Sequence, residues 1–384
     1  MTTRPSLPAI SAGLLAGFVG FSSSFSVVLQ GLSGVGATPA EAASGLMVLS
    51  IAMGLCGVVV SLWTKMPISI AWSTPGAALL ASATIPEGGF PVAVGAFLVS
   101  SILIILAGLW RPLGRIIAAI PASLANAMLA GILLALCLAP VHAVVAEPLT
   151  AGAVVLIWLA MTRIARLYAV PAAAMVAIAI IAWQAPSLGG LQALPEPVLI
   201  MPQWTVASII GIALPLFLVT MASQNIPGLA VLKANGYEPK AAPLFTATGV
   251  FSVLAVPFGG HAVNLAAITA AICAGPDAGE DPRQRYWAAV VSGLAYVGFG
   301  LTAGLVTDFA ATDPLLIQTI AGLALIGALA KSLEGAMSVA QDREAAAITF
   351  LVTASGIAVA GISAPFWGLL AGAVTLLVTR FKRR

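Results

Sequence analysis

Long apolar runs fill this sequence almost from end to end, and charged residues lie almost entirely between them. Hydrophobic residues make up 60% of the 384 positions and charged residues 8%, whereas a soluble domain carries roughly a quarter charged residues. So few charges could not cover a folded chain in water. In a bilayer, stretches of about 20 apolar residues cross a ~30 Å hydrocarbon core as helices that satisfy their own backbone hydrogen bonds. The sequence therefore predicts an all-α polytopic membrane protein.

Breaks at proline, glycine and charged residues divide the chain into fourteen predicted transmembrane segments. The first seven cover residues 8–30, 41–62, 67–84, 90–109, 113–139, 143–162 and 167–185. The second seven cover residues 205–231, 241–257, 258–274, 286–307, 314–330, 344–361 and 363–381. Because seven is an odd number, two homologous halves of this size must lie in the membrane with opposite orientation. The prediction is a 7+7 inverted repeat.

Charge placement tests this count independently, because cytoplasmic loops hold most lysines and arginines of a membrane protein. With the amino terminus inside, all sixteen basic residues fall in cytoplasmic loops or at the two termini. The charged residues of the outside loops are then all acidic, namely Glu41, Glu87, Glu147, Glu196, Asp308 and Asp313. This segregation predicts a multi-pass protein of a bacterial-type inner membrane with both termini in the cytoplasm.

Two short segments in corresponding places of the two halves have the same layout. PISIAWSTPGAALLASA (67–83) and PFGGHAVNLAAITAAIC (257–273) each contain a proline, an irregular stretch, a capping residue and a short alanine-rich helix. Thr74, followed by proline, is the predicted N-cap of the first, and Asn264 holds the equivalent place in the second. Such half-helices would start near the bilayer midplane. Two converging helix starts would favour an anion without any lysine or arginine.

Three motifs resemble one known family over almost the full chain. SQNIPGLAVL (223–232), GGHAVNLAAITAA (259–271) and ISIAWSTPGAALL (68–80) are similar to the benzoate:proton symporter, or BenE-type, family. The resemblance implies the fourteen-helix inverted-repeat fold shared with nucleobase and sulfate-type carriers. In that fold segments 3 and 10 each begin with a short strand. It also implies a core domain of residues 1–110 and 201–312 (segments 1–4 and 8–11) and a gate domain of residues 111–200 and 313–384 (segments 5–7 and 12–14).

The resemblance also implies where the substrate binds. The site would lie between the two half-helix starts, Ser73 with Thr74 and Val263 with Asn264, and three further residues would face it: Ser23, Gln224 and Asn225. Gln224 and Asn225 would be costly in lipid unless paired, which places them in the bundle interior and favours a binding role; the alternative is hydrogen bonding between helices. Trp72 could form a flat wall for an aromatic ring or simply pack. Ser23, in a serine run, could serve only close helix packing.

His261 is the predicted proton carrier, because histidine titrates near neutral pH and no other titratable group lies in its segment. The alternative is a neutral imidazole that hydrogen-bonds the irregular backbone. His142, in an outside loop, is expected to be a solvated residue.

The resulting hypothesis is uptake of a small aromatic carboxylate such as benzoate, with proton symport, by alternating access. The alternatives are a carrier of nucleobases or of other small organic anions, or a passive anion channel. An enzyme is not expected, because no HExxH, GxSxG or paired intramembrane carboxylates occur. We expect no cofactor, metal ligand set or nucleic-acid partner; the expected partners are the substrate, protons and lipid. Carriers of the resembled fold are often homodimers, but no residue pattern marks an interface.

Overall fold

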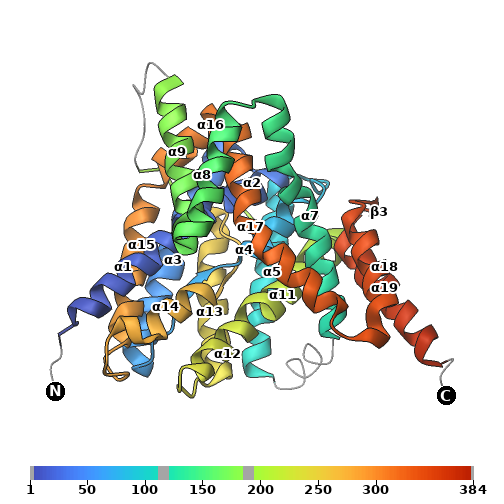
Figure 1. Ribbon diagram of the computed structural model, residues 1–384. Coiled ribbons are helices and arrows are strands. Elements are labelled where there is room, and N and C mark those ends of the chain that lie inside the picture. The colour runs from blue at the N-terminus through green and yellow to red at the C-terminus, as the bar shows by residue number, and fades with distance from the viewer. Residues whose placement is uncertain (1–3, 111–120, 185–193, 382–384) are drawn as a thin grey trace.

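The structure is a computed structural model that describes residues 4–110, 121–184 and 194–381. Within these residues, eight helical stretches are long and apolar enough to cross a membrane, or nine when the bent pair α15 (Tyr286–Leu301) and α16 (Ala303–Thr312) counts as one. Two further apolar helices are shorter, α8 (Thr150–Ile164) and residues 364–379 of α19. The predicted class, a mostly helical multi-pass membrane protein, is therefore confirmed (Figure 1).

The described parts of the chain contain the following helices and strands. Up to residue 184 the elements are α1 (Leu7–Ser22), α2 (Phe25–Gly34), α3 (Pro39–Thr64), β1 (Ile70–Trp72), α4 (Thr74–Ala81), α5 (Phe90–Leu109), α7 (Ala122–Ala146), α8, η1 (Arg166–Tyr168) and α9 (Ala169–Gln184). From residue 194 they are α10 (Val206–Ser208), η2 (Ile209–Ala213), α11 (Leu214–Thr220), η3 (Met221–Asn225), α12 (Ile226–Ala234), α13 (Ala241–Ala255), η4 (Val256–Phe258), β2 (Val263–Leu265), α14 (Ile268–Ala274), η5 (Pro276–Ala278), α15, α16, α17 (Pro314–Met337), η6 (Ala340–Asp342), α18 (Arg343–Ala354), β3 (Ala358–Val359), β4 (Ile362–Ser363) and α19 (Ala364–Phe381).

The predicted boundary between the fifth and sixth segments, at residues 139 to 143, is wrong. Helix α7 continues through Pro140 to Ala146. A proline inside a helix leaves the carbonyl four residues earlier, here that of Leu136, without its usual donor. Gly322 of α17 packs directly on this place, and a Cβ atom there would overlap both Pro140 and the Leu136 carbonyl. Close packing against another helix thus overrides the local tendency of proline to end the helix. The predicted start of the fifth segment, residue 113, lies outside the described residues.

The thirteenth segment is also shorter than predicted. Its helix, α18, ends at Ala354, and residues 358–363 form an antiparallel hairpin in which Ala358 faces Ser363. Gly356 and Gly361 have φ angles of 66° and 72°, which residues with a side chain rarely adopt, so the chain leaves the helix and then turns back on itself.

Two short strands meet at the centre of the molecule, each just before a short helix. β1 and β2 pair antiparallel, with Ile70 opposite Leu265 and Trp72 opposite Val263. Helix α4, of eight residues, follows β1, and helix α14, of seven residues, follows β2 after a short connection. The short strands expected in segments 3 and 10 are therefore present, and their pairing joins the two chain segments that lead into the half-helices.

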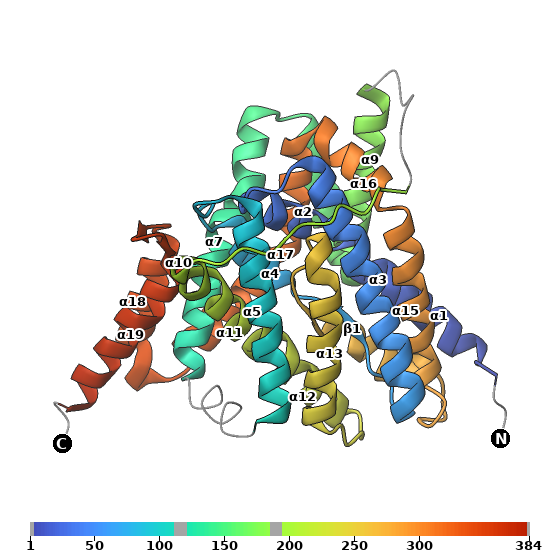
Figure 2. The same ribbon diagram turned by 180° about the vertical axis from the view of Figure 1, so that it is seen from behind.

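The helices pack in two groups that each combine elements from both ends of the chain. In one group α1 and α3 pack on α15, and α5 packs on α13. In the other, α7 packs on α17 and α18, α18 packs on α19, and α8 packs on α9. Figures 1 and 2 show α1 and α15 at one side of the molecule and α18 and α19 at the opposite side.

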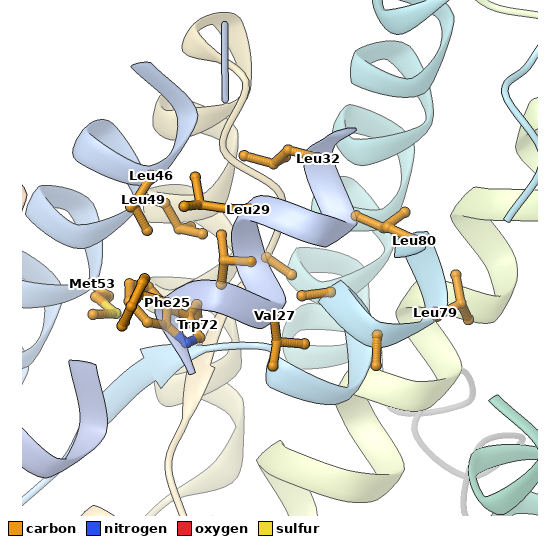
Figure 3. Packing of buried hydrophobic residues seen from close by; sticks show 14 of the residues in the cluster. Phe25, Val27, Leu29, Leu32, Leu46, Leu49, Met53, Trp72, Leu79 and Leu80 are labelled. Carbon is orange, nitrogen blue, oxygen red and sulfur yellow. The ribbon is translucent and has the colours of Figure 1, made fainter. Parts of the chain in front are cut away.

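The packing around β1 is tight and almost entirely apolar. Figure 3 shows Trp72 and Phe25 grouped with Met53, and all three belong to one buried cluster. Helix α2 lies directly on α4, because glycine at position 31 lets the backbones touch; a Cβ atom there would lie 2.5 Å from the Ala77 carbonyl oxygen. The first half-helix is therefore fixed by close backbone contact.

Arg285 fixes the far end of the second half-helix. Its Nη1 donates to the carbonyl of Ala274, the last residue of α14, at 2.9 Å, and its Nε donates to the Gly279 carbonyl at 2.7 Å. A cation at a helix carboxyl end satisfies open carbonyls and interacts favourably with the helix dipole.

Replacing Arg285 with methionine is expected to lower the free energy of unfolding by about 1.5–3 kcal/mol, the usual contribution of hydrogen bonds to a charged group. The measurement is the midpoint of unfolding of the detergent-solubilised protein in a denaturant titration. Arg283→Met is the matched control, because Arg283 is exposed. An equal shift in both variants would contradict the role assigned to Arg285.

Candidate substrate-binding site

A small cavity of about 70 Å³, open on one side, lies where β1 ends and α14 begins. Six parts of the chain contribute to it: α1, the break after α1, β1 with the start of α4, η3, the connection from β2 into α14, and α15. The lining residues are Val19, Gly20, Ser23, Ser24, Ala71, Trp72, Thr74, Gln224, Ala266, Ala267, Ile268, Thr269 and Tyr296. None of these side chains carries a charge, so the cavity is a neutral site with several hydroxyl groups and one amide.

Some of the polar groups around the cavity are already engaged. The Ser24 hydroxyl accepts a hydrogen bond from Nε1 of Trp72 at 2.8 Å and donates to the Gly20 carbonyl at 3.0 Å. The Thr269 hydroxyl is paired with that of Ser69 at 2.7 Å. The Trp72 ring is 1% exposed and tilts against Phe21, with ring centroids 5.5 Å apart. Trp72 therefore forms a rigid aromatic wall whose orientation is set by one hydrogen bond.

The cap of α4 is Ser73 and not Thr74, so the predicted N-cap is one residue too late. The Ser73 hydroxyl accepts from the Gly76 N–H at 3.1 Å and from the Thr220 hydroxyl at 2.8 Å. Its backbone N–H donates to the Ala262 carbonyl, which continues the strand pairing and keeps Ser73 extended. Thr74 is consequently the first helical residue, and its partly exposed side chain lines the cavity.

The start assigned to the second half-helix is also wrong. Asn264 lies inside β2 opposite Ala71, and α14 begins four residues later at Ile268. The reason is the strand pairing, which extends beyond β2 through a hydrogen bond from the Ala266 N–H to the Ser69 carbonyl. Val263 and Asn264 are fully buried and do not line the cavity. With seven residues α14 carries little dipole, so the site depends mainly on side-chain donors.

Gln224 and Asn225 point in different directions from η3, a π-helical turn. Gln224 lines the cavity and is partly exposed. Asn225 is fully buried, and its Oδ1 accepts a hydrogen bond from the Leu265 N–H of β2 at 2.9 Å. π-Turns often occur at functional sites, because the wider turn re-aims successive side chains. Asn225 therefore holds strand β2, and Gln224 is free to meet a ligand.

His261 is fully buried two residues before β2 and does not line the cavity. Its Nδ1 accepts a hydrogen bond from the Ala262 N–H at 2.6 Å, and its ring lies edge-on to Phe97 with centroids 6.3 Å apart. Nε2 has no partner within the described residues. The bond at Nδ1 places the proton of the neutral imidazole on Nε2.

The structure thus brings four of the predicted site residues into one cavity: Ser23, Trp72, Thr74 and Gln224. Ser73 and Asn225 hold the backbone beside it, whereas Val263 and Asn264 are buried within β2 and His261 is buried just before β2, and none of these three lines the cavity. Sequence reasoning missed Tyr296, whose side chain is 1% exposed and lines the cavity. A tyrosine in the middle of an apolar segment was the available signal, since a buried hydroxyl needs a partner.

Solved structures with the same arrangement include membrane transport proteins. The chain matches SLC26A9 at a TM-score of 0.63 and 14% identity, over 98% of this chain and 65% of the other. It matches the murine Slc26a9 anion transporter in the inward-facing state at 0.64 and 11% identity, over 100% and 69%. It matches the transmembrane domain of the cyanobacterial bicarbonate transporter BicA at 0.57 and 15% identity, over 97% of both chains. At these identities the matches establish the fold alone.

Two curated proteins are related over nearly their full lengths. Inner membrane protein YdcO of Escherichia coli (strain K12) is 41% identical over 379 residues, which cover 97% of this chain and 95% of YdcO. The benzoate membrane transport protein of Acinetobacter baylyi (strain ATCC 33305 / BD413 / ADP1) is 33% identical over 380 residues, with the same coverage of 97% and 95%. The family described as benzoate membrane transport protein, BenE, matches residues 3–378. The chain is therefore a multi-pass inner membrane transporter and belongs to the BenE family.

Proposed function

We propose that this protein imports benzoate, or a closely similar small aromatic carboxylate, together with a proton. The observation that carries the proposal is the cavity beside the paired strands, where uncharged hydrogen-bond donors lie next to the Trp72 ring. Membership of the BenE family and 33% identity to the benzoate membrane transport protein of Acinetobacter baylyi support the same substrate class.

The lining groups suit a carboxylate, which accepts hydrogen bonds and donates none. The Gln224 amide and the Thr74 hydroxyl have donors to offer, and the start of α4 adds a partial positive charge. The cavity is small, so the aromatic ring would extend toward Ile268, which lines the cavity and is 72% exposed. A site without a fixed cation binds an anion weakly enough to release it, as a carrier must.

Proton coupling removes the electrical opposition to uptake. An anion entering a cell alone works against about 2.3 kcal/mol per 100 mV of inside-negative potential. Carrying one proton with it makes the step electrically neutral. A pH difference of one unit then contributes about 1.4 kcal/mol, which corresponds to a roughly tenfold accumulation.

We assign the proton to His261. In the neutral imidazole Nδ1 is an acceptor for the Ala262 N–H, so protonation at Nδ1 would break this bond. The Ala262 carbonyl accepts from the Ser73 N–H at the start of α4. Protonation of His261 would therefore act on the strand that supports the cavity, although the imidazole does not touch the substrate.

The architecture proposed for transport is a fourteen-span inverted repeat with two moving bodies. Residues 1–110 and 201–312 would form the core domain and residues 111–200 and 313–384 the gate domain. The two packing groups, one around α15 and one around α7 and α17, support this division. Helix α1 begins and α19 ends at the same end of the molecule, as expected when both termini are cytoplasmic (Figure 1). Movement of the core against the gate would give alternating access.

The decisive experiment is uptake of radiolabelled benzoate into proteoliposomes with an alkaline interior. We expect about tenfold accumulation per unit of pH difference in the wild-type protein and collapse to the equilibrium level when the gradient is dissipated. In His261→Ala, exchange of internal for external benzoate is expected to persist while accumulation is lost. His142→Ala, in an exposed position of α7, is the matched control and should behave as wild type.

Each other outcome has a definite meaning. A rate and extent of benzoate uptake that do not change with the pH gradient would contradict proton symport. Uptake that neither saturates nor shows counterflow would indicate a passive channel. A protein that transports nucleobases or aliphatic anions but no benzoate would contradict the assigned substrate. Accumulation that survives in His261→Ala would contradict the proton carrier but leave the transporter intact.

A further inference from the structure

We infer that the Tyr296 hydroxyl donates a hydrogen bond directly to the carboxylate of the substrate and so helps to set specificity. The inference rests on the proposed function and concerns a residue of α15, outside the strands, half-helices and η3. It begins from an unpaired polar group: Tyr296 is 1% exposed, and its hydroxyl has no hydrogen-bond partner within the described part of the chain.

The hydroxyl groups of Thr269 and Ser292 lie near Tyr296, but neither forms a hydrogen bond with it. Thr269 is paired with Ser69 at 2.7 Å. The Gly20 carbonyl already accepts from the Ser24 hydroxyl at 3.0 Å and from that of Ser23 at 3.4 Å. A buried hydroxyl without a partner is unfavourable, and such groups in native structures usually meet a water or a ligand. Since Tyr296 lines the cavity, its natural acceptor is a ligand bound there.

Helix α1 is shaped around this hydroxyl. Position 20 is a glycine, and a Cβ atom built there would overlap the Tyr296 hydroxyl oxygen. Any larger residue would push the phenol out of place or occupy the cavity itself. Gly20 of α1 therefore leaves room that the Tyr296 hydroxyl of α15 occupies.

The chemistry of this arrangement selects a carboxylate. Tyr296 offers one O–H donor from the buried end of the cavity, while Gln224 and Thr74 offer donors from its other walls. A carboxylate has two oxygens and can accept from both sides, whereas an uncharged aromatic compound of the same shape would leave the tyrosine poorly paired. Hydrogen bonds to ionised acceptors are stronger than those to neutral ones, so the discrimination favours the anion.

The test measures benzoate uptake at a fixed pH gradient for wild type, Tyr296→Phe and Tyr286→Phe. Tyr296→Phe keeps the ring and removes only the donor. We expect its KM for benzoate to rise about tenfold or more, the loss of one hydrogen bond to a charged group, with the maximal rate within about threefold of wild type. Tyr286 is the matched control: it begins the same helix, is buried and does not line the cavity, so KM should stay within about twofold.

A second variant guards against a purely structural effect. Gly20→Ala is expected to raise KM in the wild-type background and to add much less in the Tyr296→Phe background, because both changes act on the same oxygen atom. Fully additive effects, or an unchanged KM in Tyr296→Phe, would overturn the assignment while leaving the transporter itself established. A wild-type protein that takes up no benzoate would overturn the proposed function, and the role of Tyr296 with it.

Discussion

Replacing Trp72 with alanine is expected to lower the free energy of unfolding by about 3–5 kcal/mol, the usual cost of removing a fully buried aromatic side chain. Trp72 is 1% exposed, packs against Phe21 and donates from Nε1 to the Ser24 hydroxyl. Its loss would leave a void beside β1, and the surrounding helices cannot all move to fill it. The midpoint of denaturant unfolding in detergent measures the effect.

The same change is expected to impair transport beyond its effect on stability, because the indole is one wall of the cavity. Trp72→Phe keeps much of the packing and removes the N–H donor, so it should lose far less stability than Trp72→Ala. Trp183→Ala is the matched control, since that side chain is 88% exposed near the end of α9. Equal shifts for positions 72 and 183 would contradict the buried, supporting role of Trp72.

Replacing Asn225 with leucine is expected to reduce benzoate uptake at least tenfold at low substrate concentration. Asn225 Oδ1 is the acceptor for the Leu265 N–H, and leucine would leave this N–H buried without a partner, at a cost of about 1–3 kcal/mol. β2 leads directly into Ala266, Ala267 and Ile268, which line the cavity, so a shift of the strand displaces one wall. A cost of 1.4 kcal/mol at the site corresponds to a tenfold loss.

The control for this variant is Asn235→Leu, in the chain segment that follows η3. Asn235 donates to the Val231 carbonyl at the end of α12 and is partly exposed, so uptake should remain within about twofold of wild type. Uptake by Asn225→Leu that equals wild type, at equal amounts of protein in the membrane, would contradict the idea that η3 positions β2.

The helices were largely predictable from the sequence because each depends on its own composition. The predicted segment 90–109 coincides with α5, and 41–62 lies within α3. The prediction failed where a distant contact overrode the local pattern. Pro140 continues a helix because Gly322 of another helix packs against it, and residues 358–363 form a hairpin where a helix was expected.

The site was predictable to the level of its motifs but not of its individual side chains. Both predicted motifs lie at one cavity. Trp72, Thr74 and Gln224 line it, whereas Asn225 holds strand β2 beside it. Asn264 is buried within β2, because strand pairing continues past the point where a helix was expected to start, and His261 is buried just before the strand.

The sequence by itself determined that the chain is a mostly helical membrane protein of the BenE type, since membrane insertion responds to apolar length and to the placement of charge within local windows. Only the tertiary structure decided which polar groups are paired. The partners that matter lie far apart in the chain: Thr220 with Ser73, Trp72 with Ser24, and Asn225 with Leu265. A polar side chain can bind a ligand only when no other group of the protein already forms its hydrogen bonds. Within the described residues, Tyr296 is the buried hydroxyl at this cavity that has no partner.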